Sequence, residues 1–318
     1  MSIEDQINVI IPERCAGRRL DQVLAELFPD FSRSRLQKWI KDGLVLVDGK
    51  QQKSKDAVTG GELVELVVVV DDETQWQPEA IALDIVHEDD QLLVINKPAG
   101  LVVHPGAGNR HGTLSNGLLY YLPALSAVPR AGIVHRLDKD TSGLMVVAKT
   151  LTAHKYLVEQ LQAREVKREY LALCNGVMTA GGTVDAPIGR HPANRLRMAV
   201  RDNGKPAVTH YRVEQRYRAH TLVRVQLETG RTHQIRVHMA YIGYPLVGDA
   251  AYGGRLRLSP QCSAAYADYL RRFKRQALHA TRLSLTHPQT QQWMQWETPM
   301  PDDMRQLVEL AEQDMEQQ

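Results

Sequence analysis

The first 70 residues change from a helical to a strand pattern of apolar positions. Apolar residues recur every three or four positions from Leu20 to Leu27, which is the spacing of one face of a helix. A second helix is predicted to begin at Ser32, because a serine side chain can cap the first turn. Two short apolar runs, 44–50 and 62–70, then predict strands, and the first of them ends in an Asp-Gly turn. Residues 16–70 are therefore predicted to form a compact α+β unit.

From residue 81 onward, strand patterns dominate and helical patterns are few. The expected strands are 92–98, 144–149, 168–176, 208–215 and 221–229. Helical spacing is found chiefly in residues 152–163 and in the stretch after Gly230. This mixture predicts the α+β fold class, with a large mixed, mostly antiparallel β-sheet and flanking helices.

The segment between the two patterns, DDETQWQPEA, is typical of a linker. It is acidic, contains a proline and follows neither a helical nor a strand period. We therefore expect three parts: a small unit at residues 1–70, a linker at 71–80 and a large domain at 81–318.

The cysteines and the apolar segments favour a cytoplasmic protein. Cys15, Cys174 and Cys262 are far apart and odd in number, which suggests neither a disulfide framework nor a CxxC metal site. The first residues lack a basic region followed by an apolar core, and the most apolar stretch, Leu63–Val70, is too short to span a membrane. Secretion and membrane insertion are therefore not expected.

The net charge of +2 conceals an uneven distribution of charges along the chain. Residues 186–240 contain 11 Lys or Arg against 3 acids, whereas residues 71–90 contain 8 acids and no Lys or Arg. A basic surface that binds a polyanion is therefore expected in the large domain. We expect a loop between strands to present Arg190, Arg195, Arg197 and Lys205 to phosphates, although a solvated hairpin fits the same pattern.

The segment AGIVHRLDKDTSGLMVVAK places a charged, turn-forming cluster between two apolar runs, which favours a functional site at the rim of a sheet. Asp138 and Asp140 are two positions apart, so an extended backbone would point them to opposite faces. A cooperating carboxylate pair is therefore disfavoured, and one aspartate is expected to act alone. Asp140 could instead cap a turn through Thr141 or Ser142. DTSG departs from the DTG of aspartic proteases by its extra serine.

Two further motifs argue against nucleotide and metal sites. The glycine-containing segment HPGAGNRHGT lacks the GKS or GKT ending of a phosphate-binding loop, so we interpret it as a mobile loop that contacts the polyanion. His233 and His238 are five positions apart on a predicted helix, which is poor spacing for shared ligation, and HExxH does not occur. No metal is expected.

Three separated segments resemble one enzyme family. HRLDKDTSGLMVVAK closely resembles the signature of the RluA family of pseudouridine synthases, and INKPAGLVVHPG and GRTHQIRVHMAYIGYPLVGDAAYGG resemble two further stretches of it. The similarity covers residues 83 to 300. The earlier segment RLDQVLAELFPDFSRSRLQKWIKDGLVLVDGK resembles the S4 RNA-binding domain, which lays basic residues along structured RNA. The basic residues expected to do so here are Arg33, Arg35, Lys38 and Lys41.

The family resemblance implies that residues 81–318 form a pseudouridine synthase domain, with Asp138 as the catalytic aspartate. The reaction breaks the C1′–N1 bond of a uridine, turns the uracil and joins C5 to C1′ without net redox change, so no cofactor is expected. The carboxylate can attack C1′, add to C6 or remove the 2′ proton, and each role requires it to be ionised in a water-poor pocket. A fixed cation is therefore expected beside Asp138, and by resemblance it is Arg231.

Two further residues take their expected roles from the family. Tyr170 matches the tyrosine that stacks on the extracted uracil, and Arg136 matches the arginine that enters the RNA stack in its place. Without the family, Tyr170 could be a core residue, and Arg136 and Arg231 could form surface ion pairs.

With an S4 domain in front, the chain resembles family members that act on large-subunit ribosomal RNA. The expected partner is that RNA or an assembling large subunit, and a monomer is expected. A rival interpretation is a non-catalytic S4-type RNA-binding or ribosome-assembly factor. A hydrolase of nucleosides or glycosides is disfavoured, because a second well-placed acid is missing.

Overall fold

The computed structural model describes residues 2–28, 31, 33–70, 76–106, 109–194 and 196–317. The chain divides into two compact units, Met1–Gln75 and Trp76–Gln318. Across the described ranges, no helix has both the length and the apolar character needed to cross a membrane.

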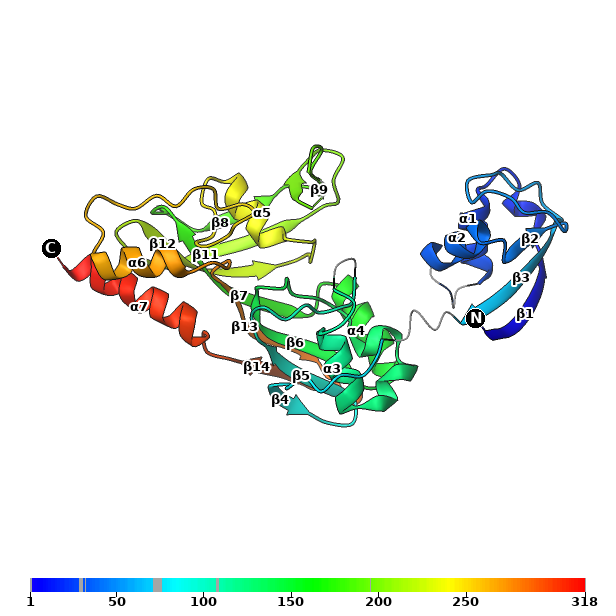
Figure 1. Ribbon diagram of the computed structural model, residues 1–318, viewed down its shortest axis with the longest axis horizontal. Coiled ribbons are helices and arrows are strands. Elements are labelled where there is room, and N and C mark those ends of the chain that lie inside the picture. The colour runs from blue at the N-terminus through cyan, green and yellow to red at the C-terminus, as the bar shows by residue number, and fades with distance from the viewer. Residues whose placement is uncertain are drawn as a thin grey trace. The chain divides into compact units, whose positions relative to one another are not determined.

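The first unit packs two helices on a small antiparallel sheet (Figure 1). Its elements are β1 (Ser2–Ile10), α1 (Leu20–Leu27), α2 (Arg33–Lys41), β2 (Val45–Val47) and β3 (Leu63–Val70). The strand order is β1-β3-β2. Fully buried apolar side chains from both helices and the sheet, including Leu24, Trp39 and Val64, form one core. The predicted α+β unit is therefore present, with β1 as an additional strand that the alternation of apolar residues did not reveal.

A buried carboxylate joins the two helices of this unit. Asp21 is fully buried and accepts hydrogen bonds from Arg19 (Nε to Oδ1, 3.1 Å), Arg33 (Nη2 to Oδ2, 2.8 Å) and Gln37. Burial acts to raise the pKa of Asp21, but these hydrogen bonds outweigh it and lower the pKa to about 2. Arg33, expected to face RNA, therefore has its guanidinium bound to Asp21. The side chain of Arg35 lies outside the described residues.

The second unit is built on a nine-stranded mixed sheet in the order β4-β5-β6-β13-β7-β12-β11-β8, with β14 paired to β13. β6 and β13 are parallel, whereas the other neighbouring strands of the described sheet are antiparallel. The strands are β4 (Ile85–Glu88), β5 (Leu92–Lys97), β6 (Ser142–Ala148), β7 (Lys167–Asn175), β8 (Gly182–Asp185), β11 (Val208–Arg216), β12 (His220–Leu227), β13 (Leu278–Thr286) and β14 (Trp293–Glu297). β9 (Ile188–Arg190) and β10 (Met198–Val200) form a separate hairpin.

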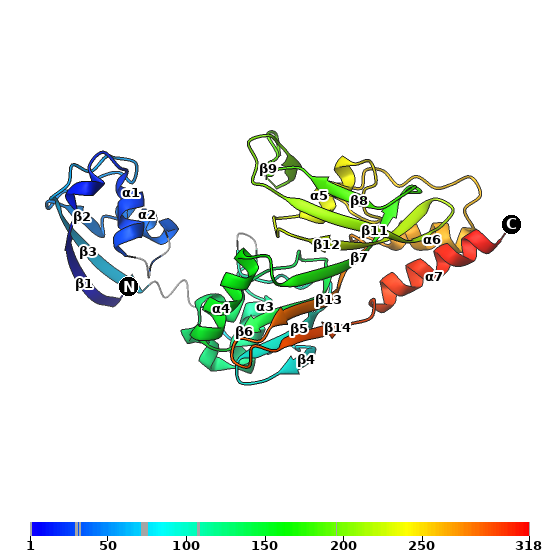
Figure 2. The same cartoon turned by 180° about the vertical axis from the view of Figure 1, so that it is seen from behind.

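Helices flank this sheet, as the sequence predicted. They are α3 (Leu114–Tyr121), α4 (Leu151–Gln162), α5 (Gln234–Tyr241), α6 (Ala264–Arg272) and α7 (Asp302–Glu316). α4 packs against β6, and α6 and α7 lie side by side in both views (Figures 1 and 2). The five expected strands correspond to β5, β6, β7, β11 and β12, and the helix expected at 152–163 is α4. The predicted fold class is confirmed.

The boundary between the units differs from the expected linker at 71–80. Trp76 packs against the main core of the second unit, and Asn116 Nδ2 donates a hydrogen bond to the Gln77 carbonyl (2.7 Å). Glu79 accepts from the Gly112 backbone N–H at 2.9 Å. Residues 76–79 therefore belong to the second unit, and residues 71–75 lie outside the described part of the chain.

Candidate active site

A cavity of about 570 Å³ in the second unit brings the expected site residues together. It lies where the loop before β6, the strand β7 and the beginning of α5 meet. The loop contributes Arg136 and Asp138, β7 contributes Tyr170, and the segment before α5 contributes Arg231. The structure therefore places these four residues around one space, although they come from three segments that are distant in sequence.

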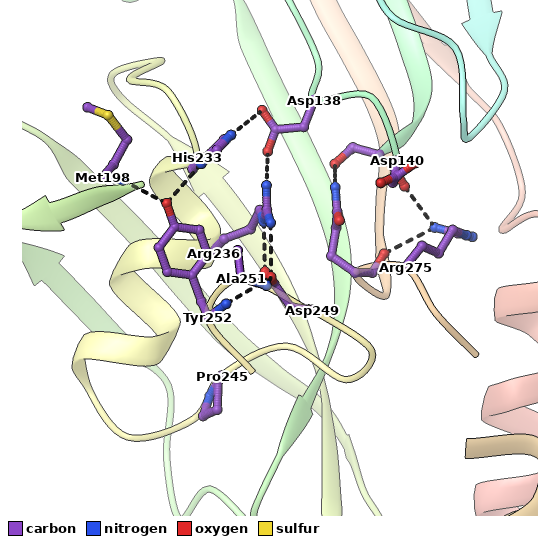
Figure 3. A network of polar contacts seen from close by, with 12 residues as sticks. Asp138, Asp140, Met198, His233, Arg236, Pro245, Asp249, Ala251, Tyr252 and Arg275 are labelled. Carbon is purple, nitrogen blue, oxygen red and sulfur yellow. Dashed lines mark hydrogen bonds and ion pairs between the residues drawn. The ribbon is translucent and has the colours of Figure 1, made fainter. Parts of the chain in front are cut away.

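Asp138 presents its carboxylate to this cavity and is held from one side by an arginine. Its side chain is 18% exposed, and its Oδ2 accepts a hydrogen bond from Arg236 Nη1 at 3.0 Å (Figure 3). Its backbone carbonyl accepts from the Thr141 N–H at 3.1 Å, which closes a turn. Asp138 Oδ2 is thus occupied, whereas no hydrogen bond to Oδ1 is found among the described residues.

Arg236, in the first turn of α5, is fixed by a second carboxylate. Asp249 accepts from Arg236 Nε (2.7 Å) and Nη2 (2.9 Å), and its Oδ1 also accepts from the backbone N–H groups of Ala251 (2.9 Å) and Tyr252 (3.0 Å) (Figure 3). The guanidinium lies 5.0 Å from the centre of the Tyr252 ring. Burial acts to lower the pKa of Arg236, but hydrogen bonds and charge from Asp249 outweigh it and raise the pKa. The cation beside Asp138 is therefore permanent.

The predicted ion pair between Asp138 and Arg231 is wrong, because Arg236 occupies that place. Arg231 Nε donates to the Pro206 carbonyl at 3.0 Å, and the Arg231 backbone N–H donates to Gln234 Oε1 at 2.9 Å. Both arginines belong to GRTHQIR, but Arg231 precedes the helix whereas Arg236 lies on its buried side. A buried arginine needs a carboxylate, and GDAAYGG supplies Asp249. That pairing was the sequence signal we missed.

His233 is a second residue that the sequence did not assign to the site. Its backbone has a left-handed φ of 57°, at the cap of α5. Tyr252 Oη accepts from the Met198 N–H (2.9 Å) and lies 2.8 Å from His233 Nδ1. Either atom can be the donor in this contact, depending on the tautomer of the ring, and His233 Nε2 lies 3.9 Å from Asp138 Oδ1 (Figure 3). Burial lowers the pKa of His233, although Asp138 opposes it, so the neutral ring is favoured.

Tyr170 and Arg136 line the cavity in different ways. Tyr170 is only 5% exposed, and burial raises the pKa of its hydroxyl, with Arg168 opposing and Asp138 adding to the rise. Arg136 is exposed, and within the described residues it forms no ion pair. The buried ring of Tyr170 suits a stacking surface, and the exposed side chain of Arg136 can reach into RNA.

A buried lysine fixes the loop that follows Asp138. Lys97, in INKPAG, is 1% exposed and donates from Nζ to the carbonyls of Pro98 (2.8 Å), Leu101 (2.8 Å) and Lys139 (2.9 Å). Burial lowers the pKa of Lys97 to about 8, against the opposing charges of Asp140 and Asp138. Lys97 therefore ties two of the family-like segments together beside Asp138.

The expected turn cap by the Asp140 carboxylate is not found in the described part of the chain. The turn is closed through the Asp138 carbonyl instead, and the Asp140 carbonyl accepts from Arg275 Nη1 at 3.3 Å. Thr141 Oγ1 accepts from Gln276 Nε2 at 3.1 Å. The two aspartates thus differ: Asp138 lines the cavity, whereas the backbone of Asp140 is bound on the side of Arg275 (Figure 3).

The other residues expected to bind RNA lie on the surface or outside the described residues. Arg190 ends β9, and Arg197 and Lys205 are exposed on the segments next to β10. Lys38 and Lys41 are exposed on α2. Arg195 lies outside the described residues.

Comparison with known proteins relates this geometry to one family. Residues 91–241 match the family model described as RNA pseudouridylate synthase, and residues 18–64 match the S4 domain. The chain is 56% identical to "Ribosomal large subunit pseudouridine synthase D" of Escherichia coli (strain K12), covering 98% of this chain and 96% of the relative. It is 59% identical to the protein of the same name from Pseudomonas aeruginosa, covering 96% of each.

Solved structures show the same fold. "Human RNA Pseudouridylate Synthase Domain Containing 4" matches with a TM-score of 0.56 at 28% identity, covering 72% of this chain and 93% of that one. "Human RNA Pseudouridylate Synthase Domain Containing 1" matches with a TM-score of 0.54 at 26% identity, covering 74% and 96%. The resemblance seen in the sequence is confirmed, and the chain belongs to the RNA pseudouridylate synthase family, in the group named ribosomal large subunit pseudouridine synthase D.

Proposed function

We propose that this pseudouridine synthase isomerises specific uridines of large-subunit ribosomal RNA, with Asp138 as the catalytic carboxylate. The observation that carries the proposal is the Arg236–Asp138 pair at 3.0 Å, in a cavity of about 570 Å³ that Tyr170 also lines. The relatives that cover nearly the whole chain are named for the large ribosomal subunit, and the S4 match supplies an RNA-binding domain.

The geometry fits the requirements of the reaction. A uridine in folded RNA must leave its stack to reach a carboxylate in a cavity, at a cost of a few kcal/mol. Once there, the base can stack on Tyr170 while Asp138 Oδ1 faces the nucleotide. Arg236 pairs with the Asp138 carboxylate and fixes its orientation through Oδ2. Attack on C1′, addition to C6 and removal of the 2′ proton all require the carboxylate in its ionised form.

Arg136 and the S4 domain have supporting roles in this proposal. Arg136 is exposed at the cavity, and a guanidinium plane can both stack on bases and pair with phosphate, so it can fill the place that the flipped base leaves. Lys38 and Lys41 on α2 supply exposed positive charge in the S4 domain. Arg231 stays a candidate RNA ligand at the cavity, without a direct contact with Asp138.

We further propose that the enzyme works as a monomer in the cytoplasm. The described residues that line the cavity, from the loop before β6, from β7 and from α5, come from a single chain. Ribosomal RNA is the substrate that this group of relatives is named for, and bacterial ribosomes are cytoplasmic.

Release of tritium from large-subunit RNA labelled at uridine C5 tests the proposal, because joining C5 to C1′ expels that hydrogen. The chain should release tritium without an added cofactor, and mapping should place pseudouridine at a small number of sites. RNA binding without release would favour the rival interpretation, a non-catalytic RNA-binding or assembly factor.

A further inference from the structure

Several arginines line the cavity, and their partners differ. Arg236 is bound to Asp138 and Asp249, and Arg164 Nη1 pairs with Glu228 Oε2 at 2.5 Å. Arg168 also lines the cavity, yet within the described residues it forms no ion pair, and its Nε is buried without a hydrogen-bond partner. Among the described residues no carboxylate neutralises the Arg168 guanidinium, so its charge is available to an anion that enters the cavity.

The strand β7 determines where Arg168 points. Successive side chains of a strand face opposite sides, so Arg168 shares its side with Tyr170, which lines the cavity. Glu169 points to the other side, where Arg224 Nη1 (3.3 Å) and Arg282 Nη1 (3.2 Å) donate to it. The acid on this strand is therefore satisfied by two arginines on the outer side. Arg168, the neighbouring cation on this strand, faces the cavity instead.

Gly230, the first residue of GRTHQIR, makes room for the guanidinium of Arg168. A Cβ at Gly230 would lie 2.9 Å from Arg168 Nη1, which is closer than real contacts allow. The close atom is the end of a flexible side chain, so a methyl group at position 230 would displace the Arg168 guanidinium rather than the backbone. Arg168 therefore passes over the backbone that leads to Arg231 and α5, on the wall of the cavity.

We propose that Arg168 binds a phosphodiester group of the RNA directly next to the uridine that stacks on Tyr170. The ligand is an anion, because the position offers an unpaired guanidinium. RNA carries one phosphate on each side of every nucleotide, and an arginine fork suits its oxygens. Arg168, Tyr170 and Asp138 line the same cavity, so a phosphate bound by Arg168 is one that adjoins the nucleotide reaching Tyr170 and Asp138. This inference rests on the proposed function, and it names the RNA group that the site binds, a phosphodiester.

The test combines protein variants with neutralised phosphates in one RNA fragment that contains a mapped target uridine. Methylphosphonate replaces the charged phosphodiester on the 5′ or the 3′ side of that uridine. Arg168→Gln should weaken binding of unmodified RNA about tenfold, the size of a lost charge-assisted hydrogen bond. At one of the two positions the methylphosphonate should weaken binding to the wild type to the same extent, and should have no further effect on Arg168→Gln. Arg168→Lys should recover part of the affinity.

Two controls keep the result specific to Arg168. Arg164→Gln removes another arginine of the cavity, one that is already paired with Glu228. The decrease in RNA affinity caused by Arg164→Gln should multiply with the decrease caused by the methylphosphonate, because the two changes affect different contacts. Gly230→Ala displaces the end of Arg168 without changing its charge and should reproduce part of the defect. Equal thermal melting of wild type and Arg168→Gln would show that the variant is folded.

The proposal is overturned if Arg168→Gln binds RNA as tightly as the wild type, or if its loss multiplies with that of the methylphosphonate at both positions. It is also overturned if the variant loses turnover without losing RNA affinity. Arg168 would then act on the Tyr170 hydroxyl instead of binding the RNA backbone. Failure of the proposed function would look different: the wild type would release no tritium, while the binding measurements would still report on Arg168.

Discussion

Arg236 and Asp249 are joined by two hydrogen bonds, 2.7 and 2.9 Å long, that fix the guanidinium plane. Asp249 is itself held by two backbone N–H groups in the turn that follows it. Only Nη1 of Arg236 is left to contact Asp138. The orientation of the Asp138 carboxylate thus depends, through Arg236, on Asp249, a residue that does not line the cavity.

Asp249→Asn should therefore reduce turnover more than RNA affinity. The substitution removes the charge that compensates a buried arginine, which should lower the free energy of unfolding by about 3 kcal/mol. Arg236 would then lose its fixed orientation toward Asp138. Single-turnover tritium release and RNA binding, measured well below the melting temperature, separate the two effects. Asp303→Asn is the matched control, because Asp303 forms a similar two-bond pair with Arg275 but is 45% exposed; turnover equally reduced in both variants would contradict a positioning role.

Asp138→Asn should abolish turnover while RNA affinity stays within about fivefold, because most binding free energy comes from phosphate contacts. The expected loss is on the order of 10⁴-fold, as for other essential groups. Asp140→Asn should retain substantial activity, because its backbone carbonyl rather than its carboxylate makes the contact with Arg275. Tritium release by the two variants distinguishes the roles of the two aspartates. Near-normal turnover by Asp138→Asn would show that this carboxylate is not part of the mechanism.

Arg236→Lys and Arg231→Lys should behave differently. Lysine at position 236 keeps a charge but cannot bind Asp249 through two nitrogens and Asp138 through a third, so turnover should fall by roughly 100-fold or more. Arg231 does not contact Asp138, so Arg231→Lys should change the Michaelis constant more than the turnover number. Steady-state kinetics on one RNA fragment compares them. The reverse order of effects would restore the assignment of Arg231 as the partner of Asp138.

Asp21 should make the S4 unit less stable at acidic pH. Its pKa is lowered from 3.8 to about 2 in the folded chain. The carboxylate therefore contributes about 2 kcal/mol above pH 4, and this contribution is lost as the pH falls from about 4 to about 2. Asp21→Asn should lose the same amount at neutral pH and no longer show this step. Hydrogen exchange of peptides from residues 7–66, measured by mass spectrometry in the full chain, reports on this unit. Unchanged exchange in the variant would contradict the prediction.

The sequence predicted the elements of this fold better than the contacts between them. Helical spacing located α1 and α4 because each buries one apolar face, and apolar runs located β5, β6 and β7 because a buried strand needs them. Neither pattern contains the strand order, since β13 pairs with β6 and β7 across more than a hundred residues of sequence. β1 escaped prediction because acidic and polar residues interrupt its alternation.

The same limit applies to the site. The aspartate was assigned through a resemblance over a contiguous segment, and the structure places it at the cavity. Choosing between Arg231 and Arg236 required the direction of each side chain around the beginning of α5, which depends on the left-handed backbone of His233. Arg33 likewise looked like a surface cation, because its partner Asp21 lies on the preceding helix. Hydrogen-bond and ion-pair partners that lie far apart in the chain cannot be inferred from a single sequence.

The S4 domain should determine affinity and selectivity while the second unit performs the chemistry. Contacts divide the chain after Gln75, and Trp76 packs on the core of the second unit, so a truncated protein should begin at Trp76. The described residues that line the cavity all lie in this unit. The truncated protein should therefore fold and retain turnover at saturating RNA.

Removing the S4 domain should nevertheless weaken RNA binding, because exposed Lys38 and Lys41 are lost with it. Each lost phosphate contact lowers the slope of log affinity against log salt by about 0.7 to 0.9, so the truncated protein should show a shallower salt dependence and a higher Michaelis constant. Fewer contacts outside the cavity also leave less to distinguish one uridine from another, so mapping should find additional modified sites. Unchanged affinity and selectivity would leave the S4 domain without a role in RNA recognition. A folded protein that is inactive at saturating RNA would instead show that the S4 domain completes the active site.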